Sequence, residues 1–152
     1  MFTNSFRGRL WLLIPLLMAD IVDNTITLVA QPAEYWRGSY LIGIEYNPIA
    51  RWFLTSHPLA FIGYCLVELI IVSKLITVLP EIAAKILSAI YSITFANSIS
   101  NWMAWRYHTN VWVTNLPLII VSVILVYAFE KASEYKRNSF RLNNRYSSPS
   151  RR

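Results

Sequence analysis

Residues 116–129 read LPLIIVSVILVYAF, a run without a single charged side chain. Such a run is typical of a helix that crosses a lipid bilayer, because a hydrocarbon core of about 30 Å takes roughly 20 helical residues. Extended to the nearest polar boundaries, it predicts a span over residues 111–129. Three more segments meet the same requirement, at residues 10–30, 59–79 and 82–106.

The composition of the whole chain agrees with these segments. Of its 152 residues 55% are hydrophobic and 14% charged, and the mean hydropathy is +0.40. Soluble domains carry roughly 25% charged residues. We therefore predict an all-α integral membrane four-helix bundle, formed as one domain by residues 1–134. The first span is not a convincing signal peptide, because its centre is charged and no small-residue cleavage site follows it.

The distribution of Lys and Arg predicts the orientation of this bundle. If both termini are cytoplasmic, eleven of the 14 basic residues lie on the inner side: Arg7, Arg9, Lys74, Lys85, Lys131, Lys136, Arg137, Arg141, Arg145, Arg151 and Arg152. The outer side then receives Arg37, Arg51 and Arg106. The positive-inside rule favours this N-in, C-in arrangement. We expect an inner or plasma membrane protein with four passes.

The basic C-terminal segment, residues 135–152, is rich in Ser, Asn and Arg and is predicted to be a disordered cytoplasmic tail. A basic tail can indicate nucleic-acid binding. On a membrane protein the simpler cause is topology, with contacts to anionic lipid headgroups. We therefore expect the lipid bilayer as a partner and no nucleic acid.

The first outer loop is rich in aromatic residues of the kind that lie among lipid headgroups: Tyr35, Trp36, Tyr40, Tyr46 and Trp52. Trp105, near the end of the third span, has the same character. Within the loop, residues 48–56 are predicted to form a short helix, because Asn47 is a good N-cap and Pro48 suits the first helical position. Its apolar residues recur at helical spacing, so we expect it to lie in the outer interface.

Three acidic residues fall inside the spans, namely Asp20, Asp23 and Glu68. Each costs roughly 2.5 to 3.5 kcal/mol in a membrane helix, so such residues normally face protein or water. Asp20 and Asp23 are three residues apart and share a helix face. At a rise of about 1.5 Å per residue, all three acids lie near mid-bilayer. We expect them to face one another inside the bundle.

Further polar residues are predicted at similar depth. The third span carries a stripe at helical spacing, formed by Tyr91, Thr94, Asn97, Ser98 and Asn101. Thr27 continues the face of the two aspartates, and Glu45 can close the cluster from the outer side. Carboxylate, amide and hydroxyl oxygens suit hard divalent cations. Carboxylates placed close together can instead share a proton. The alternative is a purely structural role, in which these polar residues hydrogen-bond to one another and fix the packing of the helices.

Chemical motifs are otherwise missing from the sequence. The single cysteine, Cys65, excludes an intramolecular disulfide and a cysteine-based zinc site. The chain has no G-x-S-x-G, H-E-x-x-H, C-x-x-C or glycine-rich phosphate loop. The aspartates also lack the D-G-x-x-A-R pattern of CDP-alcohol phosphotransferases. No enzyme class is indicated, and a membrane hydrolase or transferase is the weakest of the alternatives.

Two short motifs together resemble a family of small prokaryotic integral membrane proteins, catalogued as a domain of unknown function. One is D-x3-T in the first span, at Asp23 and Thr27. The other is E-x-N-P before the second span, at Glu45, Asn47 and Pro48. The resemblance covers about residues 15 to 75 and implies a membrane helical fold without an activity. Members often carry a lysine where this chain has Glu68.

Two functions remain open from the residues. The first is a membrane protein with a buried acidic site that binds a cation, such as a divalent ion, or carries a proton. The predicted residues of this site are Asp20, Asp23, Glu68 and Glu45, supported by Thr27, Asn97, Asn101 and Asn47. The second is a non-catalytic accessory or assembly subunit of a larger membrane complex. In that case the buried acids pair with basic residues of a partner.

Overall fold

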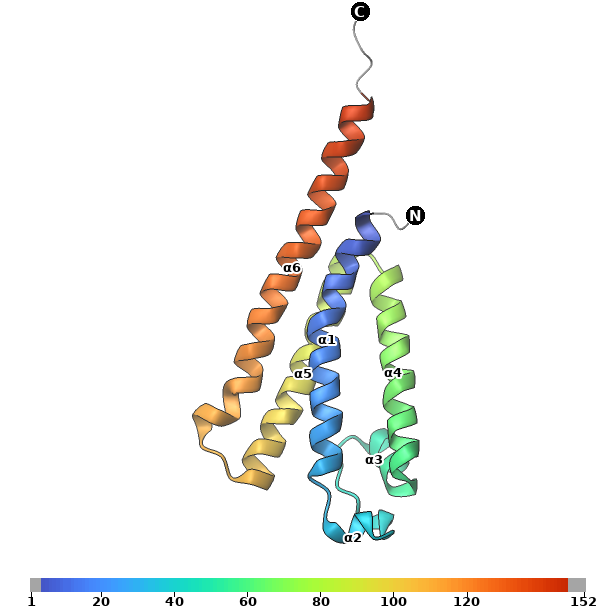
Figure 1. The fold of residues 1–152 in the computed structure, drawn as a ribbon, viewed down its shortest axis with the longest axis vertical. Helices are drawn as coiled ribbons and strands as arrows, with labels where there is room; N and C mark the ends of the chain where they lie inside the picture. The colour runs from blue at the N-terminus through green and yellow to red at the C-terminus, as the bar shows by residue number, and fades with distance from the viewer. Residues whose placement is uncertain (1–3, 148–152) are drawn as a thin grey trace, which may run out of the picture.

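The computed structural model describes residues 4–147, which form helices and connecting loops without a β-strand in that range (Figure 1). Four helices are long, and three short helical segments lie between the first and the second of them. In chain order the elements are α1 (Asn4–Val29), α2 (Ala33–Trp36), the 3-10 helix η1 (Tyr40–Ile42), α3 (Pro48–Ser56), α4 (Pro58–Val78), α5 (Glu81–Tyr107) and α6 (Val111–Ser147).

The four long helices are each long and apolar enough to cross a membrane, as predicted. The qualifying stretches are Gly8–Val29, Pro58–Val78, Glu81–Tyr107 and Val111–Asn138. Large apolar side chains such as Ile70, Val78 and Val126 are exposed on the outside of the bundle. An apolar exterior of this extent is compatible with a multi-pass membrane protein. The prediction of an all-helical bundle with four helices able to span a membrane is therefore confirmed.

Helix α1 lies at the centre of the arrangement and packs against α4, α5 and α6. Small side chains make this close packing possible, since small residues at helix interfaces let backbones approach. The buried alanine and serine residues of the long helices are Ala19, Ala84, Ser88, Ser92, Ala96, Ser100, Ala128 and Ala132. Gly8 continues this set, because a Cβ on Gly8 would lie 3.0 Å from the carbonyl oxygen of Ala132. Ser88 also links α5 to α1 by donating to the Leu12 carbonyl at 2.6 Å.

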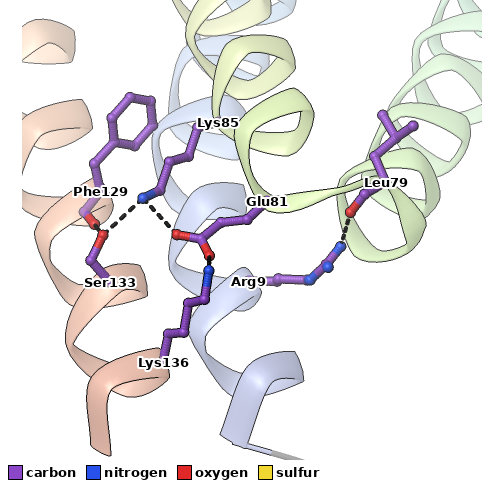
Figure 2. Close-up of polar contacts among 7 residues, drawn as sticks. All are labelled: Arg9, Leu79, Glu81, Lys85, Phe129, Ser133 and Lys136. Carbon is purple, nitrogen blue, oxygen red and sulfur yellow. Dashed lines mark hydrogen bonds and ion pairs between the residues drawn. The ribbon is translucent and has the colours of Figure 1, made fainter. Parts of the chain in front are cut away.

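The end of the bundle that holds the chain termini is tied together by polar contacts (Figure 2). Arg9 on α1 donates to the carbonyl oxygens of Ile76 at 3.3 Å, Thr77 at 3.0 Å and Leu79, at the C-terminal end of α4. Helix α5 begins at Glu81, whose carboxylate pairs with Lys85 at 2.8 Å and with Lys136 of α6 at 2.6 Å.

Side-chain N-caps explain where α3 and α4 begin. The Asn47 side chain accepts from the backbone N–H groups of Ile49 at 3.0 Å and Ala50 at 3.4 Å, and Pro48 is the first residue of α3. This N-cap was predicted from the sequence. His57 acts in the same way for α4, because its Nδ1 accepts from the N–H of Leu59 at 3.1 Å.

Tyr35 is not the headgroup anchor that the sequence predicted. Its side chain is 0% exposed and packs with Ala50 and Leu54 of α3 and with Phe61 of α4. Its hydroxyl donates to the Leu54 carbonyl at 3.0 Å, and burial raises the pKa of Tyr35 to about 12. The prediction for Tyr35 is therefore corrected. Because its ring packs against apolar side chains of α3 and α4, Tyr35 lies in a local hydrophobic core rather than on the surface.

A Tyr35→Phe substitution should lower the free energy of unfolding by about 1 to 2 kcal/mol, because the buried Leu54 carbonyl loses its side-chain donor. Equilibrium unfolding in detergent measures the change. Tyr107→Phe is the matched control, since Tyr107 is half exposed at the end of α5. Equal stability of the two variants would show that the Tyr35 hydroxyl contributes nothing.

The predicted disorder of the segment from residue 135 is corrected as far as Ser147, where α6 ends. The physical reason is that residues 130–147 contain neither Gly nor Pro, and Pro149 is the first helix breaker. Lys131 also pairs with Glu134 at 2.9 Å along the same helix, a spacing that supports helical structure. The rest of the predicted tail, residues 148–152, lies outside the described residues.

Candidate functional site

A cavity of about 870 Å³ lies between α4 and α5, bordered by α1 and by the segment that precedes α3. In Figure 1, α4 ends and α5 begins at the turn between them, and the two helices diverge toward the opposite end of the bundle. The residues that line it are Asp23, Glu45, Tyr46, Asn47, Ala50, Tyr64, Glu68, Ile90, Tyr91, Thr94, Phe95, Asn97, Ser98, Asn101, Trp102, Ala104 and Trp105.

Three carboxylates reach this cavity from three different elements. Asp23 comes from α1, Glu45 from the loop before α3, and Glu68 from α4. None of the lining side chains, all of them within the described part of the chain, is a Lys, Arg or His. The cavity wall therefore carries acidic groups without a basic side chain to compensate them.

Asp23 is the most buried of these acids. It is 8% exposed, and within residues 4–147 no hydrogen-bond partner is found for its Oδ1 atom. A buried carboxylate oxygen without a donor costs more free energy than most unpaired polar groups. This oxygen is itself enclosed by protein, although Asp23 as a residue lines the cavity.

Helix α5 supplies the polar stripe that was predicted from helical spacing. Tyr91, Thr94, Asn97, Ser98 and Asn101 all line the cavity. Thr94, Asn97 and Asn101 are also exposed, so the cavity opens along this side of α5. The hydroxyl and amide groups can donate to an anionic group or accept from a cationic one.

Glu45 and Asn47 are held together at the outer edge of the cavity. The backbone N–H of Asn47 donates to Glu45 Oε1 at 2.8 Å, and the Asn47 side chain caps α3. Burial raises the pKa of Glu45 above its ordinary value, although hydrogen bonds from the Asn47 and Tyr46 backbone act in the opposite direction. The E-x-N-P motif thus builds a local turn and places one carboxylate at the cavity.

Asp20 and Thr27, also predicted as site residues, do not line this cavity. Asp20 lies behind it in a small hollow that it shares with Glu68 and Tyr91, and its Oδ1 accepts from the Asn24 amide at 3.0 Å. Thr27 is buried, and its hydroxyl accepts from Trp102 Nε1 at 3.1 Å. Thr27 therefore orients a ring of the cavity wall rather than a ligand.

The aromatic side of the cavity was missed in the sequence. Tyr46, Tyr64, Trp102 and Trp105 line it together with Tyr91 and Phe95. Trp105, predicted as an interface anchor, is 47% exposed and also lines the cavity, because it lies on the α5 face that carries Ser98 and Asn101. The available signal was the continuation of the polar stripe at helical spacing into residues 102 and 105.

The acidic side chains of the cavity are also its potential metal ligands. Over residues 4–147 no three His, Cys, Asp or Glu side chains come close enough together to hold a metal ion. Asp23, Glu45 and Glu68 thus share a cavity without forming a ready-made coordination sphere. A divalent ion there would need the amide oxygens of α5 or water as further ligands.

No protein-family model, curated protein or solved structure matches this chain. The comparisons therefore add no support to the resemblance based on D-x3-T and E-x-N-P. The fold and the cavity define a class on their own: an all-helical chain with four helices able to cross a membrane and a hollow lined by acids and aromatic rings.

A Glu45→Gln substitution should change how stability depends on pH. Because the folded protein raises the pKa of Glu45, this group favours the folded state most below its ordinary pKa and loses that contribution as the pH rises through the raised value. Melting temperatures in detergent should therefore fall less in the variant as the pH rises above the ordinary pKa of a glutamate. Glu34→Gln, exposed and outside the cavity, is the control; identical profiles of both variants would contradict the prediction.

Proposed function

We propose that this chain is a multi-pass membrane protein whose cavity binds a cation or carries a proton at Asp23, Glu68 and Glu45, with Asp20 in support behind Glu68. The observation that carries the proposal is the unpartnered oxygen of Asp23, buried on a wall that holds three acids and no basic side chain among the described residues.

Negative charge at this depth in a membrane span must be neutralised to be stable. Ionised carboxylates in a membrane span are expensive, and several of them in one hollow repel one another. Two kinds of neutralisation are available inside the cavity: a bound proton or a bound cation. Either one makes the site respond to the concentration of that species, which is the basis of a transport or sensing function.

The same proposal includes an orientation. The start of α1, the end of α6 and the α4–α5 turn lie at one end of the bundle (Figure 1). The cavity is lined by Glu45, Asn47 and Ala50, which belong to the segment at the other end. Arg9, Lys85 and Lys136 lie at the first end, as the positive-inside rule requires of a cytoplasmic side. The cavity then faces the outer half of an inner or plasma membrane, and the exposed Ile49 and Trp52 of α3 lie in the outer interface.

An Asp23→Asn substitution tests the proposed function directly. In detergent, the melting temperature of the unsubstituted protein should change with pH or rise with Ca²⁺, Mg²⁺, Mn²⁺ or a monovalent cation, because a species bound to the folded state stabilises it. The variant should lose most of that response, whereas Glu34→Gln should keep it. A melting temperature of the unsubstituted protein that is unchanged across all these conditions would rule the proposal out.

A second candidate, an accessory subunit of a larger membrane complex, is favoured by one observation. Thr94, Asn97 and Asn101 are exposed on α5 along the opening of the cavity, and polar side chains in spans normally face protein or water. A partner helix that carries Lys or Arg could cover this side and pair with the acids. Purification in mild detergent tests this second candidate. A stoichiometric second chain that co-purifies supports an accessory subunit, and a protein that purifies alone counts against one.

A further inference from the structure

We propose that the ligand of the cavity is a protonated amine with an apolar or aromatic body rather than a bare metal ion. This inference rests on the proposed cation site and narrows it to one chemical class. Four properties of the cavity support this inference: its uncompensated negative charge, its carboxylate acceptors, its aromatic wall and its size.

Charge is the first property. Asp23, Glu45 and Glu68 approach the cavity from three elements, and within the described range none of the residues that line it is basic. A cationic ligand is thus the complement of this wall, and electrostatic complementarity is a main source of specificity in binding sites.

The carboxylates that line the cavity select the kind of cation. Asp23, Glu45 and Glu68 all line it, and Asp23 is more than nine-tenths buried with no partner for its Oδ1 atom within residues 4–147. An ionised carboxylate only accepts hydrogen bonds, so its complement is an N–H group. An ammonium group with at least one proton supplies both the charge and the donor, whereas a quaternary ammonium supplies only the charge.

The aromatic wall provides a surface for the rest of the ligand. Trp102 is fixed by its hydrogen bond to Thr27 and lies edge-to-face with Trp105, with ring centroids 5.6 Å apart. Tyr64 stacks on Phe53 at 5.0 Å. Rings that are held in place in this way bind cations over their faces and apolar groups by burial, with little ordering cost.

The size of the hollow also fits an organic ligand. Pockets for small molecules typically measure about 300 to 1,000 Å³, and this cavity has about 870 Å³. No three metal-ligating side chains converge among the described residues, so nothing in the wall is arranged for a single ion. An arylalkyl ammonium can fill the space between the acids and the aromatic rings.

The test uses the full chain in detergent with 2-phenylethylammonium as the probe. Titration calorimetry and the intrinsic fluorescence of Trp102 and Trp105 should both show saturable binding. The neutral analogue 2-phenylethanol and the quaternary benzyltrimethylammonium should bind at least tenfold more weakly, because they lack the charge and the N–H donor respectively. Mg²⁺ and Ca²⁺ should not compete with the probe.

Matched variants locate the site. Asp23→Asn should weaken binding of the ammonium at least tenfold, and Trp105→Leu about threefold to tenfold. Glu34→Gln and Trp112→Leu, both exposed and outside the cavity, should leave it unchanged. If Asp23→Asn does not fold, Glu68→Gln replaces it, with an expected loss of similar direction.

Three outcomes would overturn the inference. Equal binding of 2-phenylethanol would show that the cavity is merely apolar, and equal binding of benzyltrimethylammonium would show that the Asp23 acceptor is not used. Stabilisation by metal ions or protons without binding of the ammonium would refute the amine while leaving the proposed function intact. Absence of every such response would refute both together.

Discussion

Replacing Gly8 by leucine should destabilise the bundle by about 2 to 3 kcal/mol, since extra atoms in a well-packed contact force helices apart. A Cβ at this position would lie 3.0 Å from the Ala132 carbonyl oxygen and 3.1 Å from Tyr135 Cβ. The first of these atoms belongs to the backbone of α6, which cannot move aside as a side chain can. The melting temperature in detergent should fall clearly, and α6 should become more accessible to protease.

Gly63→Leu is the matched control for this change. Gly63 lies in α4, and a Cβ there would meet no atom within 4 Å. Leucine also has a higher helix propensity than glycine, by up to about 1 kcal/mol, so this variant should be as stable as the parent or slightly more stable. If Gly8→Leu matched Gly63→Leu in stability, the close α1–α6 contact would not exist as described.

Removing the Arg9 side chain should be the second large effect. Arg9→Leu leaves three carbonyl oxygens at the end of α4 without their side-chain donor, and hydrogen bonds to a charged group contribute about 1.5 to 3 kcal/mol. The positive charge at a helix C-terminus is lost as well. We expect a loss of about 2 to 3 kcal/mol in the free energy of unfolding in detergent.

Two further variants separate position from charge. Arg9→Lys keeps the charge but cannot reach several acceptors with a planar group, so its loss should be intermediate. Arg106→Leu removes an exposed arginine near the end of α5 and should change stability by less than about 0.5 kcal/mol. Similar effects of Arg9→Leu and Arg106→Leu would mean that Arg9 does not cap α4.

Much of the fold could be predicted because it follows from local patterns. The spans are set by runs of apolar residues, and the start of α3 by the Asn47–Pro48 cap. The continuation of α6 to Ser147 could not be seen from hydropathy, because a polar sequence without Gly or Pro can be helical or disordered. Charge composition alone favoured disorder.

The candidate site was predictable in its acids and its α5 stripe, and less so in its walls. Helical spacing shows which residues share a face, but not which neighbour that face meets. Asp20 and Asp23 share a face, yet only Asp23 lines the large cavity while Asp20 is hydrogen-bonded to Asn24. Likewise, the aromatic residues Tyr35 and Trp105 both resemble interface anchors in the sequence, yet tertiary packing buries Tyr35 completely and leaves Trp105 47% exposed at the cavity.

The most direct measurement is an experimental density map of the cavity at a resolution that shows ordered water, recorded with and without 2-phenylethylammonium. We predict that Asp23 and Glu68 face an open hollow and that density for a cation or water lies within hydrogen-bond distance of their carboxylates. With the amine present, the ring density should lie against Trp102 and Trp105. A cavity closed by protein side chains, or an Asp23 carboxylate paired with a basic side chain, would contradict the central claim.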